Sequence, residues 1–226
     1  TPLLDAPFPM ARSKSSSAWL QRHVSDPYVK QAQKDGYRSR SAYKLIELND
    51  KDKLIRSGMR VLDLGSAPGG WSQVAGKLVG EKGRVLATDI LPMDGLKNVD
   101  FIQGDFTDEA IVRQLLGWLG GGKFDLIISD IAPNITGIDS ADQASSMYFL
   151  DLALETVTLA LKPGATFVAK MFQGSGSDDY LKQLRGWFDK VLIRKPAASR
   201  PKSREVYVVA KGFRGVEPDG PDAQHD

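Results

Sequence analysis

Short hydrophobic runs alternate with amphipathic segments along most of the chain. Apolar and β-branched runs that end at Gly, Asp or Pro predict buried strands, and apolar residues spaced three or four apart predict helices. We expect strands at residues 61–64, 84–90, 99–103, 124–129, 166–172, 191–194 and 205–211. We expect helices at 27–34, from Ser39 or Ser41 onward, and at 71–78, 108–119, 144–161 and 178–188.

This alternation indicates an α/β domain with a mostly parallel sheet and helices on both faces. Ligands of such sheets bind beyond the carboxyl ends of the strands, near the point where the strand order reverses. Many chemistries share this architecture, so the function must be argued from the residues at those strand ends.

The two ends of the chain differ in composition from the rest. Residues 1–26 are basic and rich in Ser, and we expect a partly disordered N-terminal arm there. Residues 215–226 are acidic and rich in Gly, Pro and Asp, which predicts a disordered tail. A single folded domain is therefore expected over residues 27–214, an ordinary domain size.

Composition removes several classes of function. The chain has no cysteine, which excludes a disulfide framework, Cys-ligated zinc and a Cys nucleophile. Its two histidines, His23 and His225, lie outside the central region and argue against a His-based metal site or a Ser–His–Asp triad. No apolar run approaches the roughly 20 residues of a membrane-spanning helix. We expect a cytoplasmic monomer that binds no metal.

Charge is distributed unevenly, although the net charge is only +2. Residues 1–60 hold 12 basic and 6 acidic residues, and residues 190–214 hold 8 basic and 1 acidic. Residues 61–189 hold 10 basic and 17 acidic. If both basic segments fold to one side, they form a surface for a polyanion. Solvated charged segments would give the same pattern, and charge alone does not separate the two interpretations.

A glycine-rich turn follows the strand at 61–64. The strand ends in Gly65, and Gly69 and Gly70 open the next helix. Glycines let a ligand approach the backbone closely. The spacing is not the G-x-G-x-x-G of dinucleotide sites, and Pro68 removes an N–H that a pyrophosphate would use. The turn therefore disfavours a nicotinamide dehydrogenase and favours a ligand without phosphates, such as S-adenosyl-L-methionine.

Two carboxylates follow at the next strand ends. Asp89 ends the second strand, where a carboxylate can accept both ribose hydroxyls of an adenosine. Asp105 follows the third strand and is placed to accept from an adenine amino group. Alone, Asp89 could be a helix cap and Asp105 an Asx-turn residue. Together with the glycine-rich turn, they favour an adenosyl cofactor.

A lysine interrupts the apolar strand at 166–172. Lysine is rarely buried without a partner, so Lys170 needs either an ion pair or a function. Asp130, directly after the strand at 124–129, is the natural partner, and Glu205 at the start of the last strand is a second carboxylate. The alternative is a purely structural ion-pair cluster, which also perturbs pKa values.

Ordered motifs across about Ser15–Arg214 resemble those of the bacterial FtsJ-type 2′-O-ribose methyltransferases of large-subunit ribosomal RNA. The matching runs are 38–44 (RSRSAYK), 63–73 (DLGSAPGGWSQ), 91–93 (LPM), 103–105 (QGD), 129–134 (SDIAPN), 170–174 (KMFQG) and 199–207 (SRPKSREVY). The resemblance implies a Rossmann-like fold with a seven-stranded sheet and an antiparallel last strand. It also implies methylation of a ribose, that of a uridine in 23S ribosomal RNA, within the large (50S) ribosomal subunit.

The resemblance also implies site residues. Cofactor contacts carry over to Gly69, Trp71, Asp89, Asp105 and Asp130, beside Gly65 in the turn itself. The family's Lys–Asp–Lys–Glu tetrad carries over to Lys44, Asp130, Lys170 and Glu205.

The roles of the tetrad follow from the chemistry of methyl transfer. The sulfonium methyl is already activated, so the enzyme must align the reacting atoms and remove a proton from the hydroxyl. Alignment can supply about 7–11 kcal/mol. We expect Lys170 to be the general base, Asp130 and Glu205 to orient the amines, and Lys44 to act electrostatically and position the substrate.

Basic residues near the tetrad in sequence predict contacts to RNA phosphates around the active site. They are Arg38, Arg40, Lys195, Arg200, Lys202 and Arg204. Two alternatives stay open: a tRNA or mRNA-cap 2′-O-methyltransferase with the same tetrad, and a non-catalytic RNA-binding factor on the same fold. No insertion for a cap-binding pocket is evident, and the intact tetrad argues against a non-catalytic factor.

Overall fold

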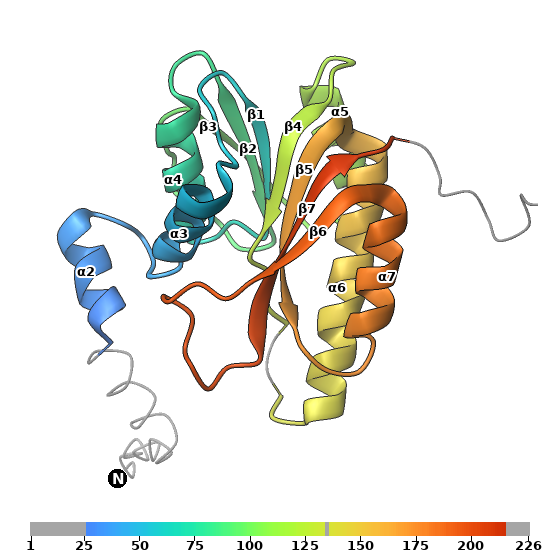
Figure 1. Cartoon of the computed structure of the whole chain (residues 1–226). Helices are drawn as coiled ribbons and strands as arrows, with labels where there is room; N and C mark the ends of the chain where they lie inside the picture. Colours follow the sequence, from blue (N-terminus) through green and yellow to red (C-terminus); the bar gives the residue numbers. More distant parts are fainter. Residues whose placement is uncertain (1–25, 134–135, 216–226) are drawn as a thin grey trace, which may run out of the picture.

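The computed structural model describes residues 26–133 and 136–215 (Figure 1). The predicted arm (1–26) and tail (215–226) lie outside the described residues, except for Asp26 and Gly215. Asn134, the last residue of the motif at 129–134, also lies outside them. Seven strands form one sheet in the order β3-β2-β1-β4-β5-β7-β6. The strands are β1 Arg60–Leu64, β2 Arg84–Asp89, β3 Val99–Gln103, β4 Phe124–Ser129, β5 Leu161–Phe172, β6 Phe188–Arg194 and β7 Glu205–Phe213.

The direction of the strands confirms the predicted mixed sheet. Strands β3, β2, β1, β4 and β5 pair in parallel, whereas β7 is antiparallel to both β5 and β6. Because β1 pairs with both β2 and β4, the strand order reverses at β1. The carboxyl ends of β1 and β4 therefore border the crevice in which α/β sheets bind ligands.

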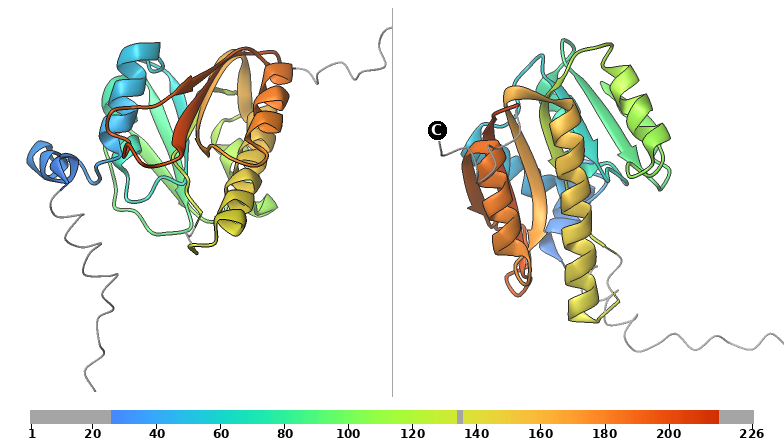
Figure 2. Two further views of the ribbon diagram at one scale, coloured as in Figure 1. Left: turned by 60° about the horizontal axis from the view of Figure 1, so that its bottom comes forward. Right: turned by 90° about the vertical axis from the view of Figure 1, so that its right-hand side faces the viewer.

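Helices cover both faces of the sheet (Figure 2). On one face, α3 (Ala42–Asp52) and α4 (Gly70–Val79) pack with the core that contains Leu45, Val74, Ile128 and Val209. On the other face, α5 (Glu109–Trp118), α6 (Asp139–Ala160) and α7 (Ser177–Trp187) surround the core that contains Phe167 and Leu154. Helix α2 (Pro27–Asp35) lies beyond α3, away from the sheet (Figure 1).

Two boundaries differ from the sequence prediction. Helix α6 begins at Asp139, five residues earlier than the apolar pattern suggested, because its first turn is polar. Asp139 and Asp142 in that turn suit the positive end of the helix dipole. Strand β5 begins at Leu161, which pairs with Phe124, and not at the predicted residue 166, so that it follows directly on the end of α6 at Ala160.

Side-chain alternation along β5 and β7 places the central site residues on one face of the sheet. Lys170 on β5 is the cross-strand neighbour of Tyr207 on β7, and Glu205 lies two residues before Tyr207. Residues two apart on a strand share a face. Tyr207 packs into the core under α3 and α4, so Lys170 and Glu205 face these helices as well.

Within the described ranges, none of the helices combines the length and the apolar character needed to cross a bilayer.

Candidate active site

A cavity of about 310 Å³ lies beyond the carboxyl ends of β1, β2, β3 and β4. This volume is in the range of small-molecule sites. Its walls are formed by Gly65, Ala67, Asp89, Ile90, Leu91, Gly104, Asp105, Phe106, Asp130, Ile131, Ala132, Pro133 and Phe149. Among these described residues, three are acidic and none is basic. The cavity therefore disfavours a polyphosphate and suits a ligand that carries positive charge and an apolar ring.

Asp89 connects the glycine-rich turn to the end of β2. Its Oδ2 accepts from the backbone N–H of Ala67 at 2.9 Å, and its Oδ1 accepts from that of Leu91 at 2.8 Å. The two oxygens of a carboxylate offer about four acceptor positions, so capacity remains for two further hydroxyl donors. This arrangement fits the ribose of an adenosyl ligand.

Gly65 keeps the cavity open. Its φ of +70° lies in the left-handed region, which glycine adopts at little cost. A Cβ atom at this position would stand 2.1 Å from Cγ1 of Ile131 on the opposite wall. Any side chain at this position would therefore run into Ile131 on the opposite wall, so this fold requires glycine directly after β1.

The other predicted cofactor residues are placed differently. Asp105 is exposed on the wall, and its Oδ1 also accepts from the N–H of Thr107 at 2.9 Å, so an Asx turn is present as well. Gly69 and Trp71 are not among the residues that line the cavity. Trp71 is 2% exposed, and its indole N–H donates to the carbonyl of Ser41 at 2.9 Å, which fastens α4 to the start of α3.

A buried carboxyl lies beneath the glycine-rich turn. Asp63 on β1 is 1% exposed, and its Oδ2 accepts from the hydroxyl of Ser72 at 2.6 Å. Burial raises the pKa of Asp63 to about 7, which the Ser72 hydrogen bond only partly offsets, and the nearby Asp130 and Asp89 carboxylates raise it further. Sequence reasoning did not single out Asp63, although a carboxyl inside an apolar strand is an unusual feature.

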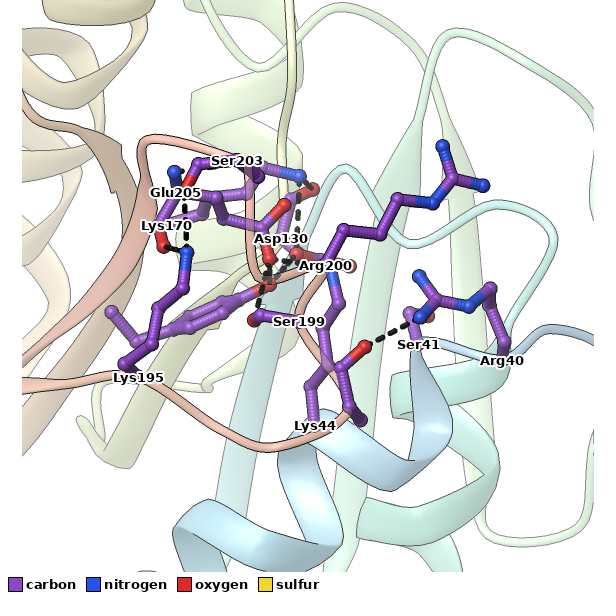
Figure 3. Close-up of polar contacts among 12 residues, drawn as sticks. Arg40, Ser41, Lys44, Asp130, Lys170, Lys195, Ser199, Arg200, Ser203 and Glu205 are labelled. Carbon is purple, nitrogen blue, oxygen red and sulfur yellow. Dashed lines mark hydrogen bonds and ion pairs between the residues drawn. The ribbon is translucent and has the colours of Figure 1, made fainter. Parts of the chain in front are cut away.

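The four residues of the predicted tetrad come together in two ion pairs (Figure 3). Lys44 Nζ lies 2.6 Å from Oε1 of Glu205. Lys170 Nζ donates to the backbone carbonyl of Asp130 at 2.7 Å and to its Oδ1 at 3.1 Å. The lysines are 6% and 8% exposed, so both charges are buried and paired, as buried charges must be.

Tyr207 joins the two pairs, and sequence reasoning did not assign it a role. Its phenol lies 2.5 Å from Oδ1 of Asp130 and 3.3 Å from Oε1 of Glu205, and it can donate to either oxygen. The Lys44 ammonium stands 5.6 Å from the centre of its ring. The cross-strand register with Lys170 sets this position, and only the motif at 199–207 pointed to it in the sequence.

The electrostatics of Glu205 reflect this packing. Burial is the largest single influence and acts to raise its pKa, but the Lys44 ammonium, Lys170 and the hydroxyl of Ser199 together outweigh burial, so that the pKa falls below its usual value. The Ser199 hydroxyl donates to the same Oε1 at 2.9 Å. Burial, Asp130 and Glu205 all raise the pKa of Tyr207 well above its usual value. At neutral pH, Glu205 is therefore ionised and Tyr207 is protonated.

The basic residues predicted to contact RNA fall into two groups. Arg200, Lys202 and Arg204 are exposed on the loop between β6 and β7, next to Glu205. Two of them form ion pairs in which the arginine side chain stays half exposed: Arg200 with Asp26 at 3.9 Å and Arg204 with Asp139 at 3.3 Å.

The remaining three donate hydrogen bonds to backbone carbonyls of the protein. Arg40 forms an ion pair with Asp26 at 3.0 Å and donates to the carbonyl of Ala198 at 2.5 Å, so it holds this loop against α3 (Figure 3). Lys195 donates to the backbone carbonyls of Ser203 and Glu205 across the base of the loop. Arg38, which precedes α3, donates to the backbone carbonyls of Pro68, Asp94 and Gly95 near the cavity.

Comparison with known proteins agrees with this geometry. The family model of FtsJ-like methyltransferases matches residues 37–213. The chain is 69% identical to ribosomal RNA large subunit methyltransferase E of Stutzerimonas stutzeri over 206 residues, which cover 91% of this chain and all of that protein. It is 62% identical to the protein of the same name from Marinobacter nauticus, over 91% of this chain and 99% of that one.

A solved structure supports the same assignment. The crystal structure of a ribosomal RNA methyltransferase from Plasmodium falciparum matches with a TM-score of 0.71 and 33% identity, covering 80% of this chain and all of that one. The family match covers most of the folded domain and includes the glycine-rich turn, the cavity and both ion pairs. The chain belongs to the family of FtsJ-like methyltransferases.

Proposed function

We propose that this protein transfers the methyl group of S-adenosyl-L-methionine to a ribose 2′-hydroxyl of large-subunit ribosomal RNA, that of a uridine in 23S ribosomal RNA. One observation carries the proposal: Asp130 both lines the acidic cavity and holds the Lys170 ammonium. The Lys170 amine is thus held next to the wall of the proposed cofactor cavity. The names of the similar bacterial proteins support the choice of ribosomal RNA.

The cofactor, when bound, supplies an activated methyl group, and the chain's own residues prepare the acceptor. In the reaction, the ribose oxygen forms a bond to the methyl carbon as the carbon–sulfur bond breaks, and the hydroxyl proton must leave. An ammonium has three donors, and two of those on Lys170 point to Asp130. Once the proton at the third position has been lost to solvent, the lone pair of the neutral amine there takes up the ribose hydroxyl proton as general base, with two N–H groups still directed at Asp130.

The other three tetrad residues position the reacting groups. Glu205 fixes the Lys44 ammonium, which contributes positive charge next to the oxygen as it loses its proton. Asp130 orients Lys170 and, through its place in the cavity wall, sets the distance between the amine and the cofactor. Gly65, Asp89 and Asp105 are the proposed cofactor contacts in the described cavity, with Gly69 and Trp71 shaping the turn and helix behind it.

The test is transfer of a radiolabelled methyl group to three substrates side by side: naked 23S ribosomal RNA, isolated large subunits that lack the modification, and tRNA. A 2′-O-methyl blocks alkaline cleavage of the adjoining phosphodiester, so resistance to alkali reports methylation of the ribose. We expect alkali-resistant label in ribosomal RNA or in the subunit. Label in tRNA alone would favour the tRNA alternative, and no label on any of the three would favour a non-catalytic RNA-binding factor.

The exposed loop between β6 and β7 is the proposed RNA contact. Reversal of Arg200, Lys202 and Arg204 to Glu should raise the RNA KM and flatten its salt dependence, because fewer counterions are released on binding. The matched control reverses Lys182, Arg185 and Lys190, which lie on α7 and β6 and give the same change in net charge. Equal effects of the two triple variants would mean that net charge, and not this loop, attracts RNA.

A further inference from the structure

Arg38 precedes α3 and joins two loops that are separate in sequence. Its Nη1 donates to the carbonyl of Pro68 in the glycine-rich turn at 3.2 Å and to that of Asp94 at 2.8 Å. Its Nη2 donates to the carbonyl of Gly95 at 3.0 Å. Pro68 lies between β1 and α4, whereas Asp94 and Gly95 lie between β2 and β3. One guanidinium thus holds the turns that follow two neighbouring strands.

The backbone around Arg38 is fixed against the first turn of α4, which directly follows the glycine-rich turn. The N–H of Arg38 donates to Oε1 of Gln73 at 2.7 Å, and Nε2 of Gln73 donates back to the carbonyl of Gly36 at 3.0 Å. A Cβ atom on Gly69 would stand 2.9 Å from Nη1 of Arg38. Glycine at this position therefore leaves room for the arginine, and the guanidinium occupies a site that both chain segments shape.

The loops that Arg38 joins carry walls of the cavity. Gly65 and Ala67 precede Pro68, and Asp89, Ile90 and Leu91 precede Asp94. An arginine presents up to five donors in a fixed planar fork, which suits several carbonyls at once in a way that a lysine does not. Three of these bonds go to carbonyls of the protein, so much of the donor capacity that could serve a phosphate is already used.

We propose that Arg38 is a positioning residue that holds the two cofactor loops together, in place of the RNA contact that its charge and its sequence neighbours predict. The inference rests on the proposed cofactor site. Loss of Arg38 should therefore weaken binding of the cofactor, whereas the affinity for RNA should depend on the loop between β6 and β7. Arg38 also connects the cofactor loops to the segment that leads into α3 and Lys44.

The experiment compares Arg38→Met and Arg38→Lys with Arg200→Met, which makes the same truncation at an exposed arginine. Calorimetry with S-adenosylhomocysteine, the demethylated cofactor, gives the Kd without RNA or turnover. Loss of three hydrogen bonds should raise this Kd about 10-fold to 100-fold in Arg38→Met, with a smaller increase in Arg38→Lys. At saturating cofactor, the RNA KM and its salt slope should stay within about two-fold of wild type. Arg200→Met should instead raise the RNA KM and lower its salt slope, with the Kd for S-adenosylhomocysteine unchanged.

The outcomes separate the two levels of the proposal. If the wild-type protein does not bind S-adenosylhomocysteine, the proposed function fails. If the wild type binds and the folded Arg38 variants bind equally well, the inference is overturned, whether or not melting curves show a loss of stability. A lower RNA salt slope in Arg38→Met with normal cofactor affinity would restore Arg38 to the RNA surface. If Arg38→Met does not fold, Arg38→Lys, which keeps the charge, decides on the same readouts.

Discussion

The two halves of the sheet's carboxyl edge are built in different ways. Over β1, β2 and β3, the cavity walls come from turns within residues 65–106, and Asp89 and Asp105 there accept from neighbouring backbone N–H groups. Over β4, β5 and β7, the tetrad gathers residues 44, 130, 170 and 205, and these are held by side chains. The cofactor half is therefore local and backbone-based, whereas the catalytic half depends on contacts between distant parts of the chain.

The two halves also bury carboxyl groups by different means. No described cation lies among the groups that shift the pKa of Asp63, and burial raises that pKa to about 7, so the group is largely neutral in the fold below neutral pH. Glu205 lies beside Lys44 and stays charged, because Lys44, Lys170 and the Ser199 hydroxyl together outweigh burial and lower the pKa. Burial thus leaves a carboxyl neutral when no cation is near and allows a charge when one is. Only the second arrangement supplies the charged groups that methyl transfer requires.

Removal of Lys170 should give the largest effect in the catalytic half. We expect Lys170→Ala to lower kcat per folded molecule by about 10²-fold to 10⁴-fold, the usual contribution of a general base, with S-adenosylhomocysteine binding preserved. The control is Lys211→Ala, which removes a lysine paired with Asp52 at 3.5 Å far from the tetrad. It should lose stability and keep its kcat. A folded Lys170→Ala enzyme with near-normal kcat would reduce the tetrad to a structural ion-pair cluster.

The neutral carboxyl of the cofactor half predicts a dependence of stability on pH. Folded Asp63 holds its proton up to about pH 7, whereas the unfolded chain releases it near pH 4. Between these values the folded state binds more protons, so its free energy of unfolding falls as pH rises, by at most about 1.4 kcal/mol per pH unit.

Asp63→Asn should remove this component, because the amide is neutral throughout and can still accept from Ser72. Urea unfolding of the wild type and of Asp63→Asn between pH 5 and 8 gives the free energy of unfolding of each. The contributions of all other titrating groups cancel in the difference between the two. We expect the free energy of unfolding of Asp63→Asn to increase relative to that of the wild type as pH rises towards 7. A difference that does not change with pH would show that Asp63 is ionised in the fold.

Tyr207→Phe tests whether the two ion pairs act as one unit. Loss of a hydrogen bond to a charged group costs about 1.5–3 kcal/mol of stability. Because the same Oδ1 of Asp130 also accepts from Lys170, we expect kcat to fall about 10-fold with cofactor Kd unchanged. Tyr180→Phe is the control, since its buried phenol donates to the carbonyl of Leu150 at 3.0 Å, outside the site. Equal kcat values in the two variants would make Tyr207 purely structural.

Asp89→Ala should have the smallest effect and belongs to the cofactor half. Loss of the ribose acceptor should raise the Kd for S-adenosylhomocysteine about 10-fold, with kcat close to wild type at saturating cofactor. Asp108→Ala, the control, removes a carboxylate that accepts from the N–H of Ala110 at the start of α5. That variant should lose about 1 kcal/mol of stability without a change in Kd. An unchanged Kd in Asp89→Ala would remove Asp89 from the site.

Much of the fold and of the cofactor half could be predicted from the sequence, because both rest on local patterns. Apolar periodicity located all seven strands, and glycine and Asp residues marked the strand ends where the cavity lies. The pairing of Lys170 with Asp130 was also predictable, since a lysine within an apolar strand needs a partner. The early start of α6 was missed because its polar first turn carries no apolar periodicity.

Only the tertiary structure decided the rest of the catalytic half. Tyr207 bonds to Asp130 because the β5–β7 register sets it opposite Lys170, and a shift of one residue would turn it to the other face. The bond from Lys44 to Glu205 spans 161 residues of sequence, and the packing of α3 on the sheet makes it. The sequence determined which residues carry charge, but the direction of each long side chain depended on packing. Arg38 and Arg200 look alike in sequence, yet one donates to carbonyls near the cavity and the other lies on an exposed loop.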